Sequence, residues 1–112
     1  MTFQNFPDRV ELKVTSDDLR RGEPRNCHLC PVVLAACRAF TELLPELRHN
    51  AFVTVGHLRL QVSFQLRVEL RVEVVYALSQ ELVDLINEFD DDPIGVEKPV
   101  KGILTKIPKG KV

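Results

Sequence analysis

The side chains of this sequence that are most able to take part in chemistry are its cysteines and histidines. Cys27 and Cys30 form a CxxC pair within the stretch CHLC, which could supply half of a tetrahedral zinc site. The further soft or borderline ligands would have to come from Cys37, His49 or His57. A second CxxC or a closely spaced histidine pair is absent, so the spacing fits zinc poorly. We therefore expect reduced structural thiols, with no metal and no cofactor.

Cys30 raises the alternative of thiol chemistry, because it stands directly before a helix expected to begin at Pro31. A helix N-terminus can lower the pKa of a thiol and make the thiolate nucleophilic. In thioredoxin-like sites, however, the cysteine pair follows a strand directly, whereas a polar loop precedes it here, and no third group is indicated to orient His28. The carboxylates gather as DD and DDD at the ends of elements, and no glycine-rich phosphate loop is present. We expect no enzyme activity, and a thiol- or zinc-dependent enzyme is the least favoured alternative.

The basic residues Arg20, Arg21 and Arg25 lie close together in a polar segment. They are the candidate contacts for nucleic-acid phosphates, and a nucleic-acid-binding accessory factor is the main alternative function. The formal net charge of the chain is -1, and acidic residues stand close to the lysines of the C-terminal segment. Because phosphate binding depends on unopposed positive charge, we expect nucleic-acid binding to be weak and nonspecific.

Hydrophobic periodicity indicates the elements that must position these residues. Apolar residues alternate in RVELKVTS and AFVTVG, which is typical of strands, and VKGILTKIP predicts a final edge strand. Helices are expected over 31–44 and 79–90, with Ser79 as an N-cap, and Ser16 is expected to cap one earlier helical turn. Cys37, within the apolar helix, is expected to fill space in the core. We predict an α+β fold, with a mainly antiparallel sheet of about four strands and two helices on one face.

A long β-ribbon is expected in the middle of the chain, because every even position from Leu58 to Leu78 is apolar. One straight strand would extend about 65 Å, at about 3.3 Å per residue, whereas a compact domain of this length is about 35 Å across. The run therefore either folds back as a hairpin near Ser63–Gln65 or projects to a partner. Both alternatives leave apolar side chains uncovered, which predicts a homodimer. The residues expected at its interface are Leu66, Val68, Leu70 and Val72.

The length of 112 residues predicts a single α+β domain over residues 1–112. The sequence has no basic start followed by an apolar run, and no apolar segment of about 20 residues. We therefore expect a cytoplasmic protein that does not enter a membrane. Three cysteines in that compartment are expected to stay reduced.

Three segments resemble a group of small uncharacterised proteins that bacteriophages and prophages encode. These segments are SDDLRRG, CHLCPVVLAACRAF and YALSQELVDLINEFDDDPIGVEKP. The resemblance implies a viral or mobile-element source and a place in the host cytoplasm, and it assigns no chemistry. We therefore expect a non-catalytic binding protein, a phage-type accessory protein that binds a host protein or a small ligand.

Overall fold

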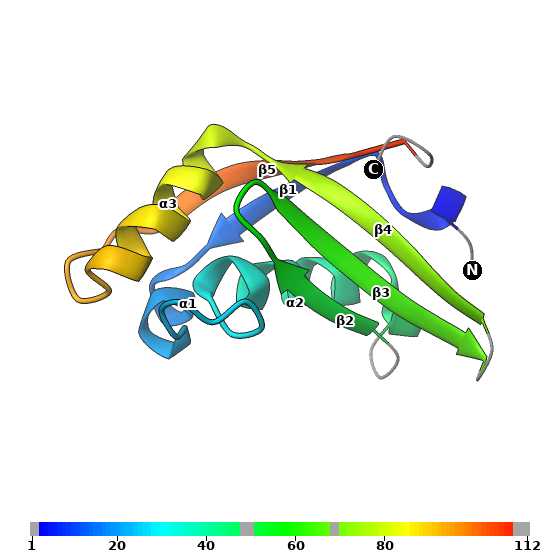
Figure 1. Ribbon diagram of the computed structural model, residues 1–112, viewed down its shortest axis with the longest axis horizontal. Coiled ribbons are helices and arrows are strands. Elements are labelled where there is room, and N and C mark those ends of the chain that lie inside the picture. The colour runs from blue at the N-terminus through cyan, green and yellow to red at the C-terminus, as the bar shows by residue number, and fades with distance from the viewer. Residues whose placement is uncertain (1–2, 48–50, 68–69, 109–112) are drawn as a thin grey trace.

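The computed structural model describes residues 3–47, 51–67 and 70–108. Within them, five strands form one antiparallel sheet: β1 (Arg9–Val14), β2 (Ala51–Val55), β3 (Arg59–Arg67), β4 (Leu70–Leu78) and β5 (Val100–Lys106). The strands lie side by side in the order β1-β5-β4-β3-β2 (Figure 1). The predicted antiparallel α+β fold is confirmed, and the described sheet has one strand more than expected.

Three α-helices accompany the sheet in the described part of the chain. They are α1 (Ser16–Arg21), α2 (Pro31–Leu43) and α3 (Gln80–Asp91), and two short 3-10 turns are η1 (Phe3–Asn5) and η2 (Pro45–Leu47). The two predicted helices are confirmed as α2 and α3, and the predicted helical turn is α1. None of these helices combines the length and apolarity needed to cross a bilayer.

The N-caps of α1 and α3 differ in how closely they match the prediction. Thr15, not Ser16, caps α1, because its hydroxyl accepts the N–H of Asp18 (3.2 Å) while the Asp18 carboxylate accepts the N–H of Thr15 (2.9 Å). Ser79 is the N-cap of α3, as predicted. Its hydroxyl accepts the N–H of Ile103 (3.0 Å), so this cap ties the start of α3 to β5.

The hydrophobic core lies between α2 and the inner face of the sheet. α2 contacts both β1 and β2, the two outermost strands, so the sheet curls around this helix (Figure 1). Alternate strand residues point inward and are buried, as the period of two requires. They include Val10, Leu12, Val14, Leu60, Val62, Phe64, Val74 and Tyr76.

The long alternating run is a hairpin of β3 and β4, which confirms one of the two alternatives. The predicted turn position is wrong, because Ser63–Gln65 lies inside β3 and the strands are joined across 68–69. Phe64 pairs with Val72 and is buried in the core, where a turn residue could not lie. From Leu60 to Phe64 the register places even residues of β3 opposite even residues of β4, so both strands present these apolar side chains to the same face, and the register shifts between Gln65 and Arg67.

β5 exists as predicted, but it is not an edge strand. It lies between β1 and β4, and this central position is possible because Pro99 and Pro108 flank the strand instead of interrupting its ladder. Gly102 pairs with Leu12 and lies under Leu82 of α3, where an added Cβ would be 2.5 Å from Leu82 Cδ2. α3 therefore packs on the same sheet face as α2, directly against the backbone of β5.

Residues before β1 close one end of the core. The Tyr76 hydroxyl donates to the Pro7 carbonyl (2.8 Å), and the Phe40 ring lies 5.2 Å from Tyr76 and 6.3 Å from Phe6 between ring centroids. The Lys106 ammonium donates to the Phe6 carbonyl at 2.8 Å. The start of the chain is therefore held by residues from its middle and from its last strand.

One buried carboxylate joins α1 to α2. Asp18 is 3% exposed, and it accepts hydrogen bonds from both terminal nitrogens of the Arg38 guanidinium, each at 2.8 Å. Arg38 also donates to the Lys13 carbonyl at 2.9 Å. Because Arg38 donates to both carboxylate oxygens and the Thr15 N–H donates to one of them, the buried charge is compensated where it lies.

Candidate functional site

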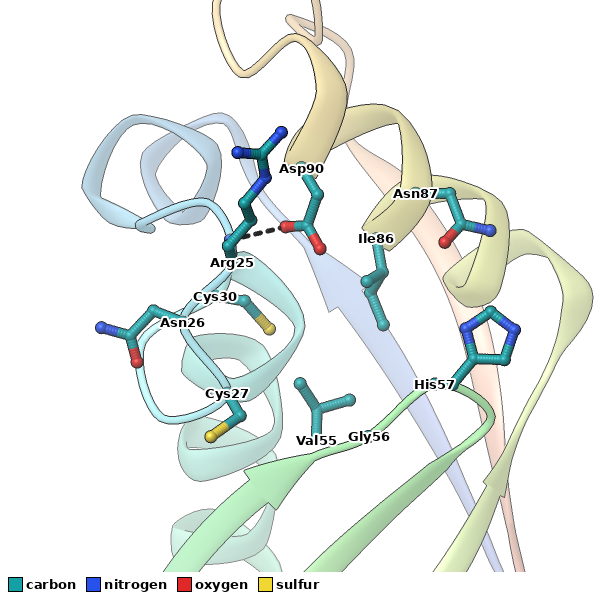
Figure 2. A pocket seen from close by; sticks show the side chains of 10 residues that line it. All are labelled: Arg25, Asn26, Cys27, Cys30, Val55, Gly56, His57, Ile86, Asn87 and Asp90. Atoms are coloured by element: carbon teal, nitrogen blue, oxygen red, sulfur yellow. Dashed lines mark hydrogen bonds between the residues drawn. The ribbon is translucent and has the colours of Figure 1, made fainter.

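The CHLC segment borders a cavity of about 230 Å³, which is the candidate functional site. Three stretches of chain meet around it: the loop before α2, the end of β2 with the turn that follows, and the middle of α3 (Figure 2). Its lining residues are Arg25, Asn26, Cys27, Cys30, Val55, Gly56, His57, Ile86, Asn87 and Asp90. The lining thus combines the apolar side chains of Val55 and Ile86, which come from β2 and α3, with polar groups (Figure 2).

Backbone hydrogen bonds hold the loop before α2 in place. The N–H of Arg25 donates to Asp90 Oδ1 at 2.8 Å, and this bond fixes Arg25 in a left-handed conformation (φ 57°) that is uncommon for residues other than glycine. The N–H of Val55 donates to the Cys27 carbonyl at 3.0 Å. The loop is therefore fastened to α3 at one end and to β2 at the other.

The two cysteines of the pair differ in environment. Cys30 is the N-cap residue of α2 and is 3% exposed, whereas Cys27 is exposed. Burial raises the pKa of the Cys30 thiol above its usual value, although the N–H groups of Val33 and Val32 at the helix start act in the opposite direction. The N–H groups at the start of α2 therefore act on this thiol as expected, but desolvation outweighs them, so the net shift does not favour a reactive thiolate. Cys30 is a buried thiol of the core.

The other candidate zinc ligands do not join the pair. Within the described ranges, no three His, Cys, Asp or Glu side chains are close enough together to hold a metal ion. Figure 2 shows His57 across the cavity from Cys27, and the sulfur of Cys27 points away from that of Cys30. Cys37 is exposed on α2, so its predicted place in the core is wrong. His49 lies outside the described residues.

Two of the three candidate nucleic-acid contacts form ion pairs with a carboxylate, and the third lies on the loop before α2. Arg20 and Arg21 both form ion pairs with Asp17, the second at 3.1 Å. Arg25 belongs to the cavity loop, where its backbone is bound to Asp90. The structure therefore does not bring the three arginines together as one unopposed basic surface.

The predicted apolar interface falls mostly outside the described structure. Val68 lies outside the described residues, and so do the side chains of Leu66 and Leu70. Val72 is half-buried and packs against the core from its position opposite Phe64. The contribution of these four residues to an interface stays a prediction.

β2 carries an exposed apolar residue that the sequence analysis did not single out. Phe52 is 68% exposed and is the one large exposed apolar side chain that lies in a strand of the described structure. Val53 and Val55 of the same strand point into the core, so alternation turns Phe52 outward. The sequence AFVTV indicated this exposure, because the alternation of the strand places its phenylalanine on the same side as the polar Thr54.

Comparison with known proteins adds no further site residues. No protein-family model matches this chain, no curated protein matches it, and no solved structure matches it. The arrangement of the chain's own residues is therefore the basis for its proposed function.

Proposed function

We propose that this chain is a non-catalytic binding protein that acts as a homodimer. Its proposed role is that of a phage-type accessory protein, which binds a host protein or a small ligand in the host cytoplasm. The observation that carries the homodimer is the exposure of Phe52 on an edge strand, because exposed apolar side chains beside open backbone groups favour association.

The two edges of the sheet support this proposal by their contrast. The outer face of β1 carries the exposed charged residues Arg9, Glu11 and Lys13, which oppose pairing with another strand. β2 has the sequence AFVTV, without a charge or a proline. Of the two edges, β2 is therefore the one whose residues favour the addition of another strand.

The oligomeric state tests the proposal directly. Light scattering at tens of micromolar protein should give the mass of two chains for the wild type, and Phe52→Asp should shift the mass toward one chain. Leu58→Asp is the matched control, because Leu58 is also apolar and 56% exposed but lies in the turn after β2. A monomeric wild type would contradict the homodimer.

A capture experiment tests the partner class. The immobilised protein should retain the same bacterial proteins from lysate with and without nuclease treatment. Proteins lost after nuclease would instead indicate that nucleic acid bridges the complex, and substitution of Arg20, Arg21 and Arg25 would then test the alternative function.

A further inference from the structure

The direction of the backbone groups along β2 can be assigned from two hydrogen bonds. The N–H of Gly56, directly after the strand, donates to the Arg59 carbonyl at 2.7 Å and therefore points toward β3. The N–H of Val55 donates to the Cys27 carbonyl at 3.0 Å and points the other way. Because the directions of the backbone N–H and C=O groups alternate from residue to residue along a strand, those of Val53 and Ala51 point the same way as those of Val55, to the open edge.

The loop before α2 limits how much of this edge is open. The Cys27 carbonyl occupies the N–H of Val55, so a strand added along β2 cannot use that position. Among the described residues, no other group binds the outward N–H and C=O groups of Ala51 and Val53. The open edge of β2 is therefore a ladder of two residues, spaced symmetrically about Phe52.

We propose that two copies of this chain pair antiparallel along this edge, with the twofold axis at Phe52. This inference rests on the proposed homodimer and specifies its contact. Ala51 of each copy lies opposite Val53 of the other, so each outward backbone group meets a partner. An axis at Val53 would place Ala51 opposite Val55, whose N–H is already bound to Cys27. A second copy is thus the occupant that matches both the length and the symmetry of the open edge.

The side chains fit the same register. At the axis, the two Phe52 residues form a pair without direct backbone hydrogen bonds, in which Cα atoms are about 4.5 Å apart and side chains lie close together. Each exposed ring then covers the other. The uncharged β2 brings no like charges together at the axis, whereas an axis at Glu11 of β1 would place two carboxylates side by side.

Cross-linking tests this register. Phe52→Cys is made with Cys27→Ser and Cys37→Ser, which remove the exposed thiols and leave the Cys27 carbonyl in place. A Cα separation of about 4.5 Å suits a disulfide, so mild oxidation should convert most of the protein into a covalent dimer. Thr54→Cys in the same background is the matched control, since the proposed axis keeps its two copies about 13 Å apart along the strands.

The outcomes separate this contact from the homodimer itself. A covalent dimer through position 52 and none through position 54 supports the proposed axis. A wild type that is dimeric by light scattering but does not cross-link at position 52 would overturn the axis and leave the homodimer standing. A dimer that dissociates with Val68→Asp and persists with Phe52→Asp would place the contact at the hairpin end. A monomeric wild type would overturn both proposals.

Discussion

Replacing Arg38 by methionine should destabilise the fold through a carboxylate that the substitution does not touch. The Asp18 side chain is 5% exposed, and the substitution removes two of its hydrogen bonds, each 2.8 Å long. Methionine preserves much of the apolar stem of arginine and supplies no donor. Asp18 then keeps the N–H of Thr15 but loses its charged partner.

The size of this effect follows from the strength and exposure of the two bonds. Hydrogen bonds to charged groups each contribute about 1.5–3 kcal/mol, and breaking a buried ion pair costs about 3–5 kcal/mol. The Arg38 side chain is 45% exposed, so solvent screening favours the lower end of these ranges. We expect a loss of about 3 kcal/mol in the free energy of unfolding at pH 7, and a fall of about 12 °C or more in Tm.

The stability loss caused by Arg38→Met should depend on pH. Burial by itself raises the pKa of Asp18, but Arg38 and Thr15 outweigh it and hold the pKa below its usual 3.8. The carboxylate therefore contributes stability above that usual value, and this contribution is lost as the pH falls through the lowered pKa. Without Arg38, burial should raise the pKa, so the variant's deficit should shrink between pH 7 and pH 3.

Urea unfolding followed by circular dichroism at both pH values measures this deficit. Arg20→Met is the control, because Arg20 is exposed and pairs only with the exposed Asp17, so little change is expected. An Arg38→Met variant as stable as Arg20→Met at pH 7 would contradict the expected loss. A deficit of equal size at both pH values would refute its electrostatic part.

Three further predictions concern the packed interior. Gly102→Ala should lower the free energy of unfolding by about 1–3 kcal/mol, because its Cβ would come within 2.5 Å of a buried leucine side chain of α3. Gly56→Ala, where the nearest atom would lie at 3.7 Å, is its control and should stay within about 0.5 kcal/mol of the wild type in urea titrations. Burial raises the pKa of Tyr76, which is the sole tyrosine, so tyrosinate absorbance should appear only when alkali unfolds the protein; a reversible rise near pH 10 with native circular dichroism would contradict this. An aromatic disulfide reagent at pH 8 should label Cys27 first, Cys37 more slowly because desolvation raises the pKa of its thiol, and Cys30 only in denaturant. Rapid labelling of all three thiols in the folded protein would show that Cys30 is accessible.

The helices and strands of this fold could be predicted where the local alternation of apolar and polar residues matches the alternation of buried and exposed positions. Val10, Leu12 and Val14 alternate with charged residues because one face of β1 meets α2, and that contrast is visible within six residues. α2 and α3 were also predictable, because each helix begins beside a recognisable N-terminal residue, Pro31 or Ser79. These features depend on neighbours in the chain.

The position of the hairpin turn could not be predicted from the same pattern. In the sequence, every even position from Leu58 to Leu78 is apolar, so the alternation contains no break that would mark where β3 ends and β4 begins. The place of β5 was missed for a related reason. Its prolines indicated an edge, but strand order depends on contacts with β1 and β4 that a local pattern does not contain.

The candidate site was only partly predictable because it is assembled from distant segments. The CHLC stretch was recognisable, but the approach of Ile86 and Asp90 from α3 depends on packing against β5. The exposure of Cys37 depends on which side of α2 faces the sheet, and α2 is apolar on most sides. The exposure of Phe52 could have been predicted, because Val53 and Val55 of the same strand occupy the inward positions and the residue before Val53 must therefore point outward.

The position of β5 between β1 and β4 has a consequence for synthesis on the ribosome. β1 is made first, but its sole strand neighbour in the described sheet is β5, which is made last. Until β5 emerges, β1 and the β2–β4 meander both pack on α2 but no strand pairs them, so each keeps an open edge, which favours slow completion and contact with chaperones. We expect ribosome-bound chains to become resistant to protease once Lys106 has left the exit tunnel. Resistance in shorter chains, in which the segment outside the tunnel ends before Val100, would show that the sheet closes without β5.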